Sequence, residues 1–210
     1  MNKDAQVIKL DDAYLTAEEL SKYINDRART LTESLEKTIN NMKLHWHGED
    51  ATLHINAWIE KYIKVAYHFQ ELTAIGKVLQ NYFVILQTGR AQLGNNKKIG
   101  DQNTNKYFYN PITKVEITTE YYYDEQLKND FITLEEFYDL YKEFVDKVDL
   151  NIEKILLNWK IGKLVRAKLI KRYQKSFIYS KDLLVEIDEL IMDLAKALQN
   201  INKINNETRE

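Results

Sequence analysis

Three side chains in the first half of the chain have the chemistry to bind a metal ion. His47, Asp50 and His54 are close in sequence, and Asp50 and His54 lie one turn apart on a helix. However, no His-x-x-x-His or Glu-x-x-His pair accompanies them, and no recognised motif supplies a third ligand. Solvated or hydrogen-bonded histidines at a helix turn explain the group better. We therefore expect neither a metal nor another cofactor, and a metal-dependent enzyme ranks third among the hypotheses.

The usual signatures of catalysis are missing from the sequence. The chain has no Cys, which excludes a thiolate nucleophile and Cys-ligated zinc or iron–sulfur clusters. It has no Gly-rich phosphate loop, Ser nucleophile motif or Ser–His–Asp arrangement. Pairs of carboxylates are frequent, but nothing in the sequence places them in a pocket. The sequence predicts that the protein is not an enzyme.

Charge is nearly balanced overall but uneven along the chain. Thirty Lys and Arg against 32 Asp and Glu give a net charge of −2, which argues against a general nucleic-acid binder. Residues 160–181 nevertheless contain no acid and eight basic residues: Lys160, Lys163, Arg166, Lys168, Lys171, Arg172, Lys175 and Lys181. This run is suited to nucleic acid, anionic lipid or an acidic partner. The favoured alternative is that it faces the acidic segment 135–153 in an antiparallel helix pair.

Long helices must position these groups, because one Pro and six Gly in 210 residues are too few for an all-β fold. Apolar residues recur at steps of three and four in four segments, each typical of an amphipathic helix. Thr-x-x-Glu capping boxes at 16–19 and 133–136 predict where the first and third helices begin. Gly48 and Gly162 fit the turns that follow, and Gly76 inside the second helix indicates a close helix crossing.

A different pattern separates the second and third helices. Residues 94–106 are rich in Gly and Asn and predict a loop. Residues 107–109 and 114–118 predict a small β-hairpin about the turn at Pro111. Residues 119–131 are acidic and predict irregular chain or a short helical turn. Four aromatic residues of this region are candidates for a partner-binding surface, unless the hairpin folds down and buries them: Tyr107, Tyr109, Tyr122 and Tyr123.

The two halves of the chain share one order of features. Each has a capping Thr, a long helix, a Trp, a turn with Gly and a longer helix, and the Thr-to-Trp spacing differs by about one helical turn. This indicates an internal duplication of a helical hairpin. Since one hairpin buries too little apolar surface, we predict an all-α, elongated four-helix bundle of two tandem hairpins with a small β-hairpin insert. The predicted divisions are a first hairpin at 1–93, a linker at 94–132 and a second hairpin at 133–210.

The residues Trp46-His47-Gly48 at the tip of the first hairpin resemble the WXG family of small type VII secretion proteins, the type of the early secreted antigenic target. The resemblance covers residues 5–90, including a short extended lead-in at 7–10. Residues 133–203 resemble a second, divergent copy, in which Trp159 and Gly162 are separated by one extra residue. The family implies that each Trp and its turn shape a recognition groove, whereas the plainer alternative is that each indole caps the bundle core.

Members of that family form four-helix bundles as dimers, so the resemblance implies a fused, monomeric version of the dimer here rather than a homodimer. It also implies passage from the cytoplasm to the cell surface or medium without a cleaved signal peptide, or escort of another protein. The implied partner is a protein: another WXG-like chain, a larger toxin or the secretion ATPase. No nucleic acid, catalysis or membrane span is implied, and the apolar runs are too short to predict a transmembrane helix.

Family members or their partners carry Tyr-x-x-x-Asp/Glu just after the second helix. The chain has three matches, close to the number that its composition produces by chance, and only Tyr121 with Glu125 follows the first hairpin outside a predicted helix. This pair is the candidate export motif, although the linker displaces it. The alternative function is a helical binding module of another pathway, such as an immunity or scaffold protein, in which the Trp residues are purely structural.

Overall fold

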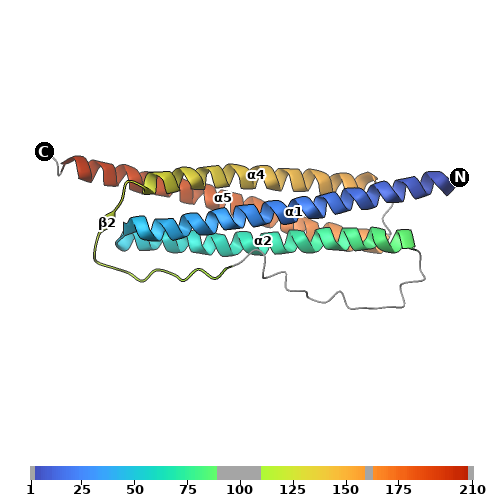
Figure 1. The fold of residues 1–210 in the computed structure, drawn as a ribbon, viewed down its shortest axis with the longest axis horizontal. Helices are drawn as coiled ribbons and strands as arrows, with labels where there is room; N and C mark the ends of the chain where they lie inside the picture. Colours follow the sequence, from blue (N-terminus) through green and yellow to red (C-terminus); the bar gives the residue numbers. More distant parts are fainter. Residues whose placement is uncertain (1–2, 89–109, 159–162, 208–210) are drawn as a thin grey trace.

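The computed structural model describes the backbone of residues 3–88, 110–158 and 163–207, with side chains placed for 16–82, 110–156 and 166–204 (Figure 1). Trp159, Gly162, Tyr107 and Tyr109 lie outside the described residues. The described elements are α1 (Lys3–His45), β1 (Trp46–His47), α2 (Glu49–Thr88), β2 (Tyr122–Tyr123), α4 (Leu127–Asn158) and α5 (Lys163–Glu207).

The four helices form one elongated bundle (Figure 1). Within it, α1 packs against α2 and α4, while α5 packs against α2 and α4. Each hairpin therefore covers the apolar stripe of the other, as the sequence predicts. The predicted fold class is confirmed: an all-α, elongated four-helix bundle of two tandem hairpins with a small β element.

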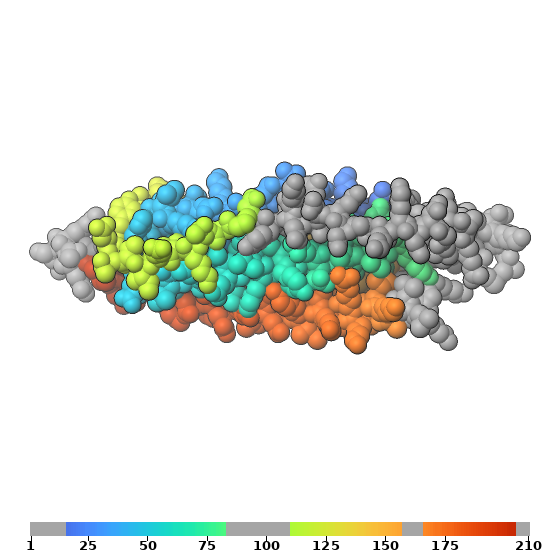
Figure 2. Space-filling model, turned by 90° about the horizontal axis from the view of Figure 1, so that it is seen from below, coloured from blue at the N-terminus to red at the C-terminus, as the bar shows by residue number. Residues whose placement is uncertain are grey.

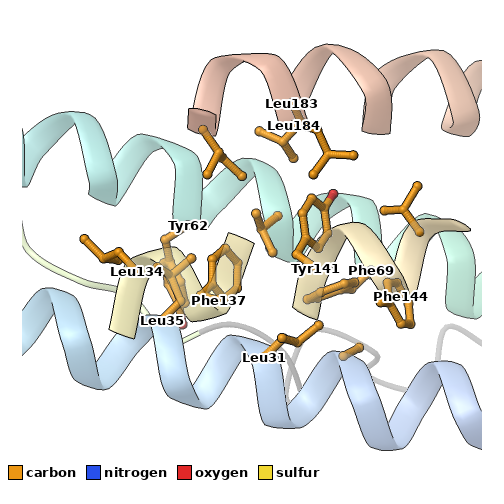
Figure 3. Close-up of a cluster of buried hydrophobic side chains, with 14 of the residues drawn as sticks. Leu31, Leu35, Tyr62, Phe69, Leu134, Phe137, Tyr141, Phe144, Leu183 and Leu184 are labelled. Atoms are coloured by element: carbon orange, nitrogen blue, oxygen red, sulfur yellow. The ribbon is translucent and has the colours of Figure 1, made fainter. Parts of the chain in front are cut away.

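A single hydrophobic cluster runs through the bundle and takes side chains from all four helices. Within it, the Phe69 ring of α2 makes T-shaped contacts with Tyr141 and Phe144 of α4, with ring centroids 5.7 and 5.2 Å apart (Figure 3). Phe137 stacks on Tyr141 one turn further along α4. Because the contacts of Phe69 cross between the hairpins, neither hairpin has a complete core of its own.

Both predicted helix starts are wrong, and so is the extended lead-in at residues 7–10. Residues 16–19 and 133–136 lie inside α1 and α4, and residues 7–10 are helical. Thr133 donates its hydroxyl to the carbonyl of Asn129 within the helix instead of capping it. The cap of α4 is Asp124, whose carboxylate accepts the Gln126 amide at 2.9 Å. Residues 127–131, predicted to be irregular or a short turn, therefore already belong to this helix.

The small sheet does not form where the sequence predicts it. β1 and β2 pair antiparallel, with Trp46 opposite Tyr123 and His47 opposite Tyr122. The described part of the predicted hairpin, residues 110–118, contains no strand. Figure 2 shows this yellow-green segment stretched across α1 and α2. Its backbone groups bond to helix side chains, which removes the need for a hairpin partner.

Because the core is shared, truncating two leucines of α2 should lower stability by very different amounts. Leu72 is 2% exposed and Leu53 is 63% exposed, so truncation to Ala leaves a cavity only at Leu72. We expect Leu72→Ala to lower the free energy of unfolding by about 2–5 kcal/mol and Leu53→Ala by less than about 0.5 kcal/mol. Urea denaturation of both variants measures the difference. Equal losses would show that the interior is not packed as described.

Candidate functional site

The turn between α1 and α2 is a tight reversal centred on Gly48. Its φ of +122° lies in the region that L side chains rarely adopt. Its carbonyl accepts both the amide and the hydroxyl of Thr52 at 2.9 Å, which satisfies the first turn of α2. A Cβ at this position would lie 3.3 Å from Tyr121 Cδ2, so the linker passes directly over the turn. Glycine is required here by both conformation and space.

Trp46 sits beneath this turn as part of the core. It is 2% exposed, and its ring stacks on His54 at 5.3 Å between centroids. Its indole Nε1 is buried without a hydrogen-bond partner. Burial lowers the pKa of His54, while Asp193 and Asp50 act in the opposite direction. The indole thus caps the bundle core, and Trp46 also lines the cavity beside it.

That cavity, of about 380 Å³, opens beside the turn where the two hairpins meet. Trp46 and His54 line it from the first hairpin, Tyr121 from the linker, and Asp193 and Ile201 from α5. It combines aromatic and aliphatic walls with carboxylates at its rim. The sequence did not predict it, because its walls come from three segments that are far apart in the chain.

The structure brings the candidate export motif to the same tip as Trp46 and Gly48. Tyr121 is 58% exposed, and burial of its remaining surface raises the pKa of its hydroxyl. Tyr122 is exposed and makes a T-shaped ring contact with His47, whereas Tyr123 is half-buried. Glu125 is exposed in the turn that leads into α4. Pairing of β2 with β1 therefore brings Tyr121, Tyr122 and Glu125 to the end of the bundle that carries Trp46 and Gly48.

The histidines do not assemble a metal site. His47 packs on Tyr122 and His54 on Trp46, and among the described residues no three His or acidic side chains are close enough to hold an ion. His45 has a different role that the sequence did not reveal. Its Nδ1 lies 2.6 Å from the buried Asp130 carboxylate in the first turn of α4. This contact joins the end of α1 to the start of the second hairpin.

A second polar contact lies in the middle of the core. The Tyr141 hydroxyl and His68 Nδ1 are 2.7 Å apart, and both side chains are almost fully buried. Desolvation lowers the pKa of His68 to about 3, so the imidazole is neutral at physiological pH. The sequence could not indicate this pair, since its members belong to different hairpins.

The basic run on α5 meets the acidic segment of α4 at one described ion pair. Lys181 pairs with Asp146 of α4 at 2.9 Å, and the Tyr173 hydroxyl donates to Asp149 at 3.0 Å. These contacts confirm that segments 135–153 and 169–187 lie side by side. Arg172 turns the other way and pairs with Glu71 of α2. Lys160 and the side chain of Lys163 lie outside the described part of the chain.

Comparison with protein-family models, with curated proteins and with solved structures finds no match to this chain. Within the described helices, no stretch is both long and apolar enough to cross a membrane.

Two glycines of the first hairpin should respond oppositely to the same substitution. Gly48→Ala forces a Cβ into a positive-φ turn under Tyr121, and we expect it to destabilise the protein by about 1–3 kcal/mol. Gly76 lies inside α2, where an added Cβ meets Ser21 and Ile24 at ordinary contact distances of 3.5–3.6 Å. Gly76→Ala should therefore stabilise by about 0.5–1 kcal/mol. Thermal denaturation that moved both variants in the same direction would contradict this account of the turn.

Replacing Asp149 should stabilise the protein, and the size of this effect should depend on pH. Desolvation raises its pKa to about 6, and its Oδ2 is buried without a partner. The folded state thus binds this proton more tightly than the unfolded state, so stability falls as pH rises from about 4 to 6. Allowing for partial solvent screening, Asp149→Asn should be about 1–2 kcal/mol more stable than wild type at pH 7.5 and nearly equal at pH 4.

Denaturation at both pH values tests this, with Asp146→Asn as the exposed control on the same helix. The control should lose less than about 1 kcal/mol at either pH, because its ion pair with Lys181 is solvent-exposed. An advantage of Asp149→Asn that did not depend on pH would refute the assignment of a buried, ionised carboxylate.

Proposed function

We propose that this protein is a non-catalytic interaction module of the WXG kind, acting in type VII secretion as a secreted protein or as an adaptor for a secreted partner. One observation carries the proposal. The Trp46-His47-Gly48 turn and the Tyr121–Glu125 segment, separate in sequence, form a single tip. Exposed aromatic and charged side chains cover this tip, and such side chains anchor protein interfaces.

The bundle also supports a single-chain form of the family's dimer. In the proposed module α4 and α5 take the place of a partner chain, because they bury the stripes of α1 and α2. Lys61 and Lys64 of α2 both reach Glu186 of α5 at 2.6 Å, which adds a polar link across the hairpins. These contacts support the proposal that the second hairpin fills, within one chain, the interface at which family members dimerise, and the proposal expects a monomer.

The roles within the tip differ. Trp46 acts by shaping the turn and the cavity wall, since only 2% of its surface is exposed. Tyr121, Tyr122 and Glu125 are the groups that a partner can contact. The proposed partner is a protein of the secretion pathway: the ATPase, a larger toxin or another WXG-like chain.

Secretion from a host with a working type VII system tests the proposal. Tyr121→Ala and Glu125→Gln should each reduce the protein's amount in the culture fluid, or its recovery with the secretion ATPase, at least tenfold at equal cellular levels. Tyr67→Ala and Glu116→Gln are matched controls, because they make the same changes at exposed positions outside the tip. Both controls should behave like wild type.

Unchanged export in cells that lack the ATPase, together with no recovery on it, would reject the secretion role. An immunity or scaffold module would then be the better explanation. Light scattering gives an independent check: the proposal expects the 24.9 kDa mass of one chain. A stable dimer would show that the two hairpins do not replace a partner chain.

A further inference from the structure

The linker segment 110–118, here called the strap, is held by side chains that bond to its main chain. The Asn56 amide pairs with both backbone groups of one residue: Val115 N donates to Oδ1 at 2.8 Å, and Nδ2 donates to the Val115 carbonyl at 3.0 Å. A neighbouring β-strand would offer the same donor and acceptor. A single helix side chain therefore takes the place of a strand partner.

Two further contacts of the same kind extend along the groove between α1 and α2. Lys43 Nζ donates to the Thr113 carbonyl at 2.6 Å. The Asn110 amide donates to the Tyr62 hydroxyl at 3.0 Å. Because these bonds reach backbone groups, they do not depend on which side chains the extended segment carries.

Two other features of the bound strap indicate which peptide sequences the groove would select. Every third strap residue is half-buried, namely Ile112, Val115 and Thr118, while the residues between them are exposed. This is the three-residue period of an extended polyproline-type chain. An acidic residue lies beside the strap, where Glu60 pairs with Lys114 at 2.7 Å. The groove thus favours a segment with apolar residues at every third position and a basic residue beside the second of them.

We infer that the groove between α1 and α2 is a binding site for extended peptide segments, which the strap occupies in cis. A partner protein binds there by inserting a segment of the same chemistry and displacing the strap. Ile112 and Val115 only border the core, so the exchange leaves the helix core intact. Figure 2 shows the strap on the outer surface of α1 and α2. This inference does not rest on the proposed secretion role.

The cis strap sets the affinity that a partner needs. A tethered segment has an effective concentration on the order of millimolar. A free segment at micromolar concentration must therefore bind about a thousandfold more tightly than the strap to replace it. The cavity at the tip supplies room for such added contacts, because Tyr121, three residues beyond the strap, forms part of its wall.

Fluorescence anisotropy with a labelled peptide of residues 110–120 (NPITKVEITTE) tests the site. The receiving protein is the full chain with Val115→Asp, which places a charge at a half-buried strap position and leaves the groove unchanged. A second strap variant, Lys114→Glu, opposes Glu60 at an exposed position and serves if the first does not fold. We expect the peptide to bind either strap variant at least tenfold more tightly than it binds wild type.

The contacts themselves are tested by adding Asn56→Ala to the strap variant, which should weaken peptide binding at least tenfold. A control peptide with Asp in place of Val115 should bind at least tenfold more weakly as well. Binding that ignores both changes would overturn the inference. So would no binding to a strap variant whose amides 112–118 exchange rapidly with deuterium. A dimer by light scattering that exchanges straps would make the occupant a second copy and overturn the assignment to a partner protein.

Discussion

The structure depends on one constraint: each amphipathic hairpin leaves an apolar stripe that it cannot bury by itself. The second hairpin supplies the cover, and the contacts of Phe69 with Tyr141 and Phe144 are where the two stripes meet. A buried aromatic pair of this geometry contributes about 0.5–1.5 kcal/mol beyond its area. The two hairpins therefore complete one core, and the linker between them must adopt whatever path their docking leaves open.

The path of the linker explains why residues distant in sequence meet at the tip. Since α4 packs antiparallel on α1, its first turn comes to the end of α1, where His45 meets Asp130 and the Asp124 amide donates to the His45 carbonyl. The chain just before α4 then has to pass the α1–α2 turn, and β2 pairs with β1 there. Gly48 leaves room for Tyr121 in this crossing. The proposed recognition surface is thus a consequence of how the second hairpin begins.

Features with a helical period could be predicted from the sequence, and features that depend on distant partners could not. The apolar stripes, the number of helices and the Gly48 turn follow from residues three or four apart or from one glycine. The capping boxes misled because Thr-x-x-Glu also fits the interior of a helix, where Thr133 bonds to Asn129. The strap has the composition of a strand, but its backbone partner is Asn56, 59 residues away. The Tyr121–Glu125 motif was identified locally, whereas its position beside Trp46 depends on the fold.

The apolar stripes alone do not fix the register between the helices, and polar groups inside the core do. A stripe with steps of three and four tolerates a slip of one helical turn, because apolar side chains would still meet apolar side chains. Such a slip would separate Tyr141 from His68 and bury both polar groups unpaired, at a cost of about 1–3 kcal/mol each. His45 with Asp130 and the two lysines on Glu186 oppose the same slip at other levels of the bundle. The register that places the tip and the strap groove therefore rests on a few hydrogen bonds between hairpins, whereas the bundle itself rests on apolar burial.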